Sequence, residues 1–236
     1  MKLQQAIADW LGNGKTVNDT ITEGEIKSRL AQDNGALTLS NKNISDMSGF
    51  EIFKGTDLKE LNVSYNSLTS LDVTGLSALT SLDASNNRPL TSLNVTGLSA
   101  LTSLDAFNTA LTSLDVSGLT SLTSLNAFKT ALTSLDVTGL SALKNLDASN
   151  NDQLTSLDVT GLTNLTTLVA SGNSQLTSLD VTGLTNLTTL YADYNDQLTS
   201  LDVTGLTNLT TLYASPLTAA DVKGFNPNQY SDTDLQ

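Results

Sequence analysis

Residues 58–208 repeat one apolar frame seven times in succession. The units are 21 or 22 residues long and begin at Leu58, Leu79, Leu101, Leu122, Leu143, Leu165 and Leu187. A unit of this length cannot bury its apolar side chains alone, so neighbouring units must stack and share one core. The repeat therefore predicts a continuous elongated solenoid over residues 37–215, with partial units at 37–44 and 209–215 and about nine coils in all.

Each unit has two halves with the same leucine spacing. In the last full unit, the alternation around Leu190 and Ala192 has the period of two that is typical of a strand. The second half repeats the spacing at Leu198, Leu201 and Val203, and no window keeps a 3.6-residue period. We expect parallel strands from the first halves on the concave side, and short extended or turn-like backbone on the convex side.

The two ends of the chain read as caps. Residues 1–36 predict two short helices, the first from the apolar stripe Leu3, Ile7, Trp10 and Leu11. Thr22 and Glu25 have the spacing of a capping box at the start of the second. Such helices are marginal alone, so we expect them to pack on the first coil.

Residues 216–236 are expected to close the other end. Thr218 predicts the start of a short helix that ends at Gly224. Phe225 and Tyr230 would cover the last coil, and residues 231–236 are expected to be mobile.

The frame resembles the leucine-rich repeat, L-x-x-L-x-L-x-x-N-x-L. Within that class it is similar to internalins, whose J-type repeats read L-x-x-L-x-C-x-x-N-x-L-T-x-L-D-V-S. Residues 58–215 follow this pattern with alanine, or Val63 in the first unit, at the cysteine position. The resemblance implies a right-handed α/β solenoid and a bacterial protein, secreted or at the cell surface, with an adhesion or host-interaction role.

Two polar ladders run through the repeats. An asparagine recurs at 66, 87, 151, 173 and 195, and we expect its amide to bond backbone groups inside the coil. Thr109 and Thr130 take this position in two adjacent units, which predicts a different turn there. Aspartates recur on the convex side from Asp72 to Asp202. They are expected to accept bonds from local turn amides, with a calcium ladder as the alternative.

Side chains at the outward positions of the concave strands do not pack in the core. Residues at these positions that differ from the usual residue of the repeat are therefore the candidate ligand-binding residues. These residues are Phe107, Phe128, Tyr191, Asp193, Tyr194 and Tyr213. Aromatic side chains are enriched at binding hot spots. Two alternatives stay open: the phenylalanines pack locally over the altered turns, or the tyrosines pack beneath the C-terminal cap. The row Asp83, Asp105 and Asp147 is expected to be a solvated face.

The composition argues against several classes of partner and of catalytic chemistry. The formal charge is −13, with 11 basic and 24 acidic residues, which disfavours nucleic acids and anionic membrane surfaces as partners. No apolar stretch reaches the roughly 18 residues of a membrane span. The chain has no histidine or cysteine, which excludes disulfides, thiol chemistry and histidine-dependent triads, and no cofactor or metal is expected.

These observations predict a non-catalytic, monomeric binding module that presents its concave surface to a protein or glycan. One alternative is a carbohydrate-active enzyme that uses concave carboxylates. Another is a passive, ice-like surface reader built on the regular threonine rows. The first ten residues lack the apolar core of a signal peptide, so a surface location rests on the resemblance alone.

Overall fold

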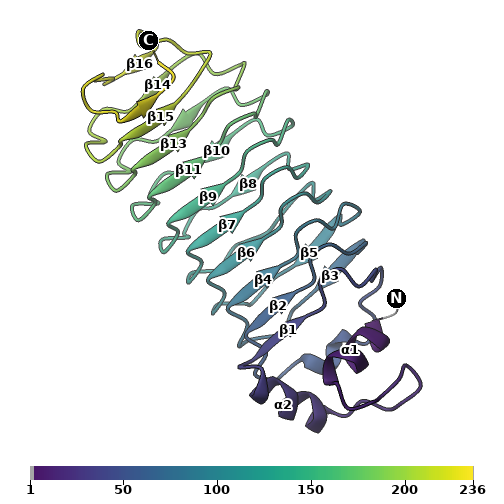
Figure 1. Cartoon of the computed structure of the whole chain (residues 1–236). Coiled ribbons are helices and arrows are strands. Elements are labelled where there is room, and N and C mark those ends of the chain that lie inside the picture. The colour runs from purple at the N-terminus through teal and green to yellow at the C-terminus, as the bar shows by residue number, and fades with distance from the viewer. Residues whose placement is uncertain (1–2, 236) are drawn as a thin grey trace.

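Consecutive repeats stack into an elongated solenoid with two helices at its N-terminal end (Figure 1). The structure is a computed structural model that describes residues 3–235. Helices α1 (Leu3–Leu11) and α2 (Glu23–Gln32) form the N-terminal cap. A short 3₁₀ helix, η1 (Phe50–Phe53), lies between the first two strands of the main sheet, and the sequence pattern gave no signal for it.

The first halves of the repeats, together with the C-terminal residues Asp232–Thr233, form a main sheet of ten parallel strands. Its central leucines pair in register, as Leu82 does with Leu104 and Leu104 with Leu125. In spatial order the strands are β1 (Ala36–Thr38), β2 (Glu60–Asn62), β4 (Ser81–Asp83), β6 (Ser103–Asp105), β7 (Ser124–Asn126), β9 (Asn145–Asp147), β11 (Thr167–Val169), β13 (Thr189–Tyr191), β15 (Thr211–Tyr213) and β17 (Asp232–Thr233). The predicted parallel sheet is confirmed.

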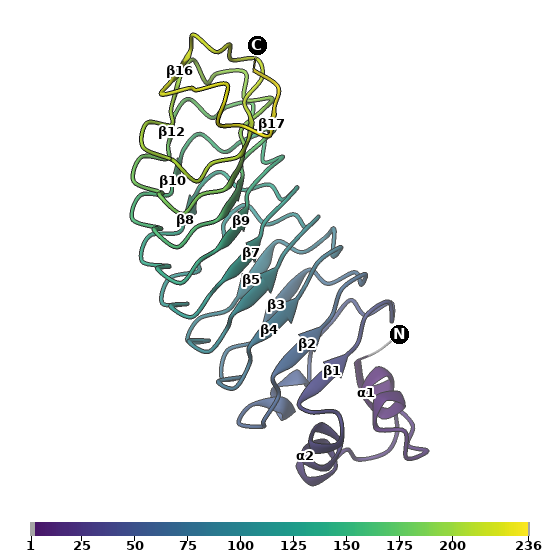
Figure 2. The same cartoon turned by 60° about the vertical axis from the view of Figure 1, so that its left-hand side comes forward.

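The second halves form short strands on the other side of the stack (Figure 2). They group into the sheets β3–β5, β8–β10–β12 and β14–β16. Their bounds are β3 (Ser70–Asp72), β5 (Ser92–Asn94), β8 (Leu135–Asp136), β10 (Leu157–Asp158), β12 (Leu179–Asp180), β14 (Leu201–Asp202) and β16 (Val222–Lys223). The extended, non-helical backbone expected there is confirmed.

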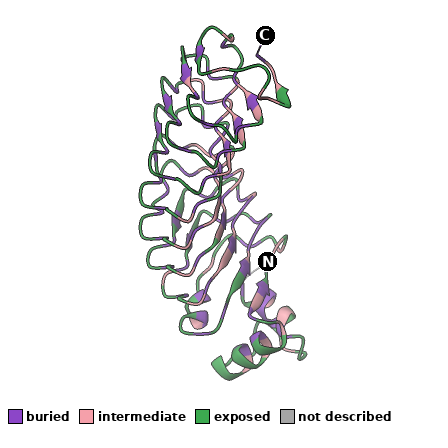
Figure 3. Ribbon diagram, turned by 90° about the vertical axis from the view of Figure 1, so that its left-hand side faces the viewer, coloured by how far each residue is buried: buried purple, intermediate pink, exposed green. Residues whose placement is uncertain are grey.

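Buried residues recur along both sides of the stack (Figure 3), and their side chains form one continuous apolar core. The unit that starts at Leu187 inserts seven side chains, none more than 4% exposed: Leu187, Leu190, Ala192, Leu198, Leu201, Val203 and Leu206. Each fully buried large side chain contributes about 1.5–3 kcal/mol. The alanine position is buried in every unit, so alanine forms an apolar ladder down the core.

The ladder asparagines bond backbone groups inside the coils, as predicted. Asn151 is fully buried; its Nδ2 donates to the carbonyl oxygens of Ala127 and Ala148, each at 3.0 Å. Its Oδ1 accepts from the amide nitrogen of Leu132 at 3.2 Å. One side chain thus satisfies groups from two adjacent coils, which a buried polar group requires.

The turns with threonine at this position are arranged differently, also as predicted. The Thr109 hydroxyl donates only within its own coil, to the Ala106 carbonyl at 2.9 Å. The backbone amide of Ala110 reaches the Leu90 carbonyl of the preceding coil at 2.9 Å, and the amide of Ser67 beside Asn66 makes the equivalent bond to Ile44 at 2.8 Å. The Thr109 turn therefore differs by lacking the asparagine's side-chain bond to the preceding coil, which Asn66 makes to the Leu39 carbonyl at 2.8 Å.

The convex aspartates cap their own turns. Asp136 Oδ1 accepts from the backbone nitrogen of Thr138 at 2.9 Å and from its hydroxyl at 2.7 Å. These bonds hold the pKa of Asp136 below its usual value, and those of Asp158 and Asp180 are lowered by the same kind of bond. Within residues 3–235, no three acidic side chains are grouped to hold a metal ion.

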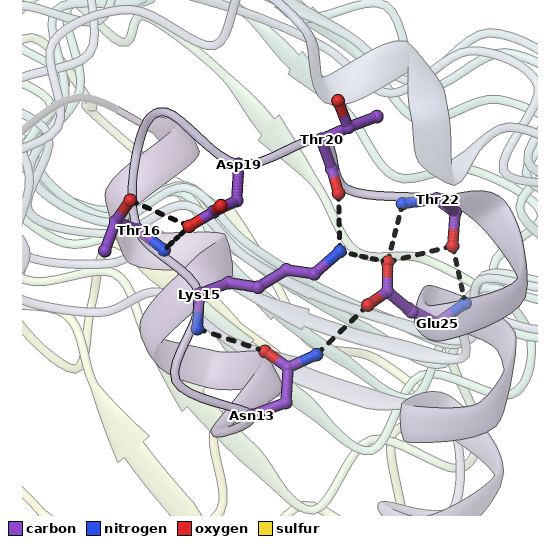
Figure 4. Close-up of polar contacts among 7 residues, drawn as sticks. All are labelled: Asn13, Lys15, Thr16, Asp19, Thr20, Thr22 and Glu25. Carbon is purple, nitrogen blue, oxygen red and sulfur yellow. Dashed lines mark hydrogen bonds and ion pairs between the residues drawn. The ribbon is translucent and has the colours of Figure 1, made fainter.

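The N-terminal cap forms as expected, and one carboxylate organises it (Figure 4). The Thr22–Glu25 capping box is present at the start of α2. Glu25 also accepts from Lys15 Nζ at 2.6 Å and from Asn13 Nδ2 at 3.1 Å. The Lys15 bond, followed by the bonds from Thr22, lowers the pKa of Glu25 to about 2.

The predicted C-terminal helix is wrong. Thr218 and Asp221 form a single turn in which the Asp221 carboxylate accepts from the Thr218 backbone nitrogen at 2.9 Å. The chain then enters β16, where Val222 pairs with Leu201 and is buried. The segment continues the stack because Val222 can occupy a core position of the next coil, which stabilises it more than an isolated helical turn would.

The expected mobility of the tail is also wrong for residues 231–235. β17 adds to the main sheet beside β15, and Leu235 is buried. Gln236 lies outside the described residues. Phe225 and Tyr230 stack at 5.2 Å between ring centroids and pack against the core, as expected for a cap.

Candidate binding surface on the main sheet

Outward side chains of the main sheet align in three rows across the strands, because the strands pair in register. Neighbours within a row are one strand spacing apart, about 4.7–4.9 Å. The first row is Asp83, Asp105, Asn126, Asp147, Val169, Tyr191 and Tyr213. The second row lies two residues later: Ser85, Phe107, Phe128, Ser149, Ser171, Asp193 and Ser215. The third row follows directly: Tyr65, Asn86, Asn108, Lys129, Asn150, Gly172 and Tyr194.

Phe107 and Phe128 form an aromatic stack in the second row. Their ring centroids are 5.2 Å apart and the ring planes differ by 4°. Both side chains are half-buried, yet they are not among the partly buried side chains that pack against the core. The neighbours in the row are small on both sides, Ser85 and Ser149. The two rings therefore lie against each other on the sheet surface.

The acidic part of the first row lies beside this stack. Asp83, Asp105 and Asp147 each use Oδ1 to accept a backbone N–H two residues on, at 2.9–3.0 Å. All three are partly buried and keep part of their surface in solvent. Burial raises the pKa of Asp105, and the charges of Asp83 and Asp147 raise it further.

A second aromatic group lies nearer the C-terminal end. Tyr191 and Tyr213 stack at 5.3 Å with ring planes at 24°. The Tyr213 hydroxyl donates to Asp232 Oδ1 at 2.5 Å, which raises the pKa of Tyr213 to about 12. Asp193 accepts from the Ser171 hydroxyl at 2.6 Å. Tyr213 is thus tied to the terminal strand β17.

The six predicted residues fall into these two groups and do not form one cluster. Strands β9 and β11 separate β7 from β13, so the groups are three strand spacings, or about 14 Å, apart. Tyr194 is 70% exposed and has a φ of 56°. Tyr65 in the same row is 62% exposed with a φ of 54°, and it was missed as a candidate. Its third-row position, shared with Tyr194, was the available signal.

Other surface features lie away from this face. A cavity of 220 Å³ at the N-terminal cap is lined by residues that include Leu3, Ile7, Val17, Ile21 and Ile52. Within the described part of the chain, no helix is long and apolar enough to cross a bilayer.

Solved structures share this architecture. The functional domain of InlJ from Listeria monocytogenes, which includes a cysteine ladder, superposes with a TM-score of 0.69 at 27% identity, over 99% of this chain and 58% of that one. The chain has a leucine-rich repeat fold similar to that of internalins. YopM, a leucine-rich effector from Yersinia pestis, gives a TM-score of 0.70 at 24% identity, over 99% of this chain and 64% of YopM. Internalin C2 of Listeria monocytogenes gives 0.62 at 21% identity, over 99% and 92%.

Sequence comparison agrees with the fold. The family of the leucine-rich repeat domain of the endo-β-N-acetylglucosaminidase EndoS matches residues 15–131. That match concerns a repeat domain and carries no glycosidase assignment to this chain. No curated protein sequence matches. The internalin-like chain spans about three-fifths of the InlJ and YopM structures, at 58% and 64% of their lengths.

Proposed function

We propose that this internalin-like chain is a non-catalytic module that binds a partner protein on the outward face of its main sheet. The observation that carries the proposal is the Phe107–Phe128 stack, which lies on the sheet surface and outside the core. Large aromatic side chains at such positions are typical of binding hot spots. We propose further that the chain is monomeric and that a bacterium secretes it or displays it on its surface.

Backbone conformation at the third row supports the same face. Asn86, Asn108 and Asn150 have φ near 55° there, and asparagine tolerates that region well. Tyr65 and Tyr194 adopt it as bulky residues, which is unfavourable, and both are mostly exposed. Lys129 in the same row shares this φ, so the conformation belongs to the repeat turn, and Tyr65 and Tyr194 stand out by their large, mostly exposed aromatic side chains. Contact with a partner accounts for both tyrosines.

The two alternatives have less support. The first-row carboxylates lie in a periodic row and each caps a backbone N–H, which is a structural role. On the threonine rows, Thr91 and Thr133 donate their hydroxyls to carbonyls of the preceding coil, at 3.3 and 3.4 Å. Their hydroxyls therefore hold the coils together. Neither arrangement favours catalysis or ice binding over protein recognition.

The proposal is tested by probing the chain against panels of purified cell-surface proteins and of glycans, then measuring the affinity of each hit for matched variants. We expect Phe107→Ala/Phe128→Ala and Tyr194→Asn each to weaken a protein hit by at least about tenfold. The control Thr138→Ala/Thr160→Ala on the convex side should leave affinity unchanged. Thermal unfolding of each variant checks that the fold is intact.

Unchanged affinity in both the Phe107→Ala/Phe128→Ala and the Tyr194→Asn variants would overturn the proposal. Hits confined to the glycan panel would replace the protein partner with a carbohydrate one.

A further inference from the structure

We infer that the partner segment that docks on the Phe107–Phe128 stack is basic and carries an arginine, whose guanidinium group lies against the ring of Phe107 and pairs with the first-row carboxylates. The inference rests on the proposed binding function and specifies the chemistry of the partner at that face.

Among residues 3–235, the first-row carboxylates have no counter-ion. Across residues 3–235, the ion pairs involve Lys15, Lys27, Arg29 and Lys223, none of them with a first-row carboxylate. Asp83 and Asp105 are direct neighbours in register, and like charges opposite each other on a sheet are unfavourable. A cation brought by a partner would relieve this repulsion. The raised pKa of Asp105 is consistent with a carboxylate that lacks such a cation.

Charge is distributed unequally across the stack. The carboxylates lie in the first row, on one flank of the rings. Lys129, which is exposed, lies in the third row on the other flank. Asn86 and Asn108 in that row bond to each other at 2.9 Å and are neutral. A basic group is therefore favoured only on the first-row flank, which gives the docked segment an orientation.

The position beside Phe107 suits a flat cation. The next residue in its row towards the N-terminus is Ser85, so no large side chain follows Phe107 in the stack. Asp83 lies two residues before Ser85 on the same strand end and places a carboxylate beside that position. A guanidinium group can stack on an aromatic face and pair with a carboxylate at once, whereas an ammonium group does this less well.

The convex aspartates do not offer the same site. Asp136 and Asp158 each accept both an N–H and a hydroxyl bond from their turn threonine, and both are exposed. No aromatic side chain lies in that row. Attraction of a cation to exposed carboxylates is weak and screened by salt. They therefore provide a matched control for non-specific charge.

The inference is tested with fluorescein-labelled octa-arginine and octa-lysine, whose binding to the full chain is followed by fluorescence anisotropy at physiological ionic strength. Octa-arginine should bind several times more tightly than octa-lysine. Asp83→Asn/Asp105→Asn and Phe107→Ala/Phe128→Ala should each weaken octa-arginine by about tenfold. Asp136→Asn/Asp158→Asn removes the same charge and should weaken it by less than about twofold.

These substitutions are chosen so that the variants keep the native fold. Asparagine can keep the turn bond, because Asn126 already accepts from the Phe128 backbone nitrogen at 3.0 Å in the same row. Phe107→Leu/Phe128→Leu keeps apolar bulk without an aromatic face, and should weaken octa-arginine more than octa-lysine.

Three results would overturn the inference: equal loss in the convex control, equal binding of both peptides, or no effect of the phenylalanine variants. Different results would contradict the proposed function. A protein hit that needs Phe107 and Phe128 but ignores Asp83→Asn/Asp105→Asn keeps the binding function and removes the arginine. Octa-arginine binding at the stack without any protein hit on this face keeps the arginine site and removes the protein partner of the proposed function.

Discussion

At the scale of single residues, the buried asparagines join the coils most firmly. Asn173 Nδ2 donates to the carbonyls of Ala148 and Ala170 at 3.2 and 2.8 Å, and its Oδ1 accepts from the backbone nitrogen of Asn151 at 2.8 Å. Asn173 is 0% exposed, so water cannot replace these bonds. A buried group left without a partner costs about 1–3 kcal/mol. The side chain stabilises the stack by satisfying backbone groups of two adjacent units.

We therefore expect Asn173→Ala to lower the free energy of unfolding by about 3 kcal/mol, since it leaves several buried groups unpaired. Thr109→Ala is the matched control and should cost about 1 kcal/mol, because Thr109 makes one hydrogen bond within its own coil. Urea unfolding of both variants measures the difference. Equal losses would show that the asparagine bonds contribute no more than the threonine bond.

At the scale of elements, the helical cap covers the first coil through a few specific contacts. Trp10 of α1 lies 6.0 Å from Phe53 of η1 between ring centroids, and its Nε1 donates to Asp33 at 3.0 Å. Glu25 ties the loop between the helices to the start of α2 through Lys15. The cap is thus fixed by both apolar packing and one shared carboxylate.

Glu25→Gln should lower the thermal unfolding temperature at neutral pH, because the ion pair with Lys15 and the charge at the helix start are lost. The folded pKa of about 2 lies below the unfolded value near 4.5. The stabilisation by Glu25 is therefore complete above about pH 4.5 and is lost as the pH falls toward 2. The difference between wild type and variant should shrink over that window.

Glu23→Gln is the control for this experiment. It removes the same charge from the same helical turn and breaks only the exposed pair with Lys27. Its effect at neutral pH should be smaller, since exposed pairs of this kind contribute little. A loss as large as that of Glu25→Gln would contradict a special role for Glu25.

At the scale of the whole molecule, each unit contacts only its neighbours, so the stack behaves as a one-dimensional array. Leu168 and Leu190 pair in register, and so do Leu190 and Leu212. The unit 165–186 can therefore be removed without changing the register of what remains. Its removal brings the Phe107–Phe128 stack and Tyr191 closer by one strand spacing, about 4.7–4.9 Å.

Deletion of residues 165–186 should give a folded, cooperatively unfolding protein with a lower unfolding temperature, because one shared interface is lost. Octa-arginine binding at the phenylalanine stack should be unchanged, whereas a protein that contacts both aromatic groups should bind less well. Circular dichroism and anisotropy measure these outcomes. Deletion of residues 165–179, which breaks the register, is the control and should disrupt the fold.

The repeat was sufficient to predict most of the architecture. Leucines such as Leu104 and Leu125 recur one unit apart and can be buried only if the units stack in parallel. The same register places Phe107 beside Phe128, so their stacking follows from a spacing of one repeat. Where the pattern ends, the prediction failed: residues 218–224 were assigned a helix, and residues 231–235 were assigned no structure.

The sequence by itself determined the stack and the rows of its surface, because a short apolar repeat has one way to bury its leucines. Only the tertiary structure decided how the non-repeating parts meet those rows. The bond from Tyr213 to Asp232 depends on β17 joining the sheet. The pKa of Asp105 is raised by burial and by the neighbouring charges of Asp83 and Asp147. The side chain of Tyr65 is 62% exposed, which its position in the repeat did not predict. Burial and charge pairing are properties of neighbours in space, and a repeat specifies those neighbours only within its own frame.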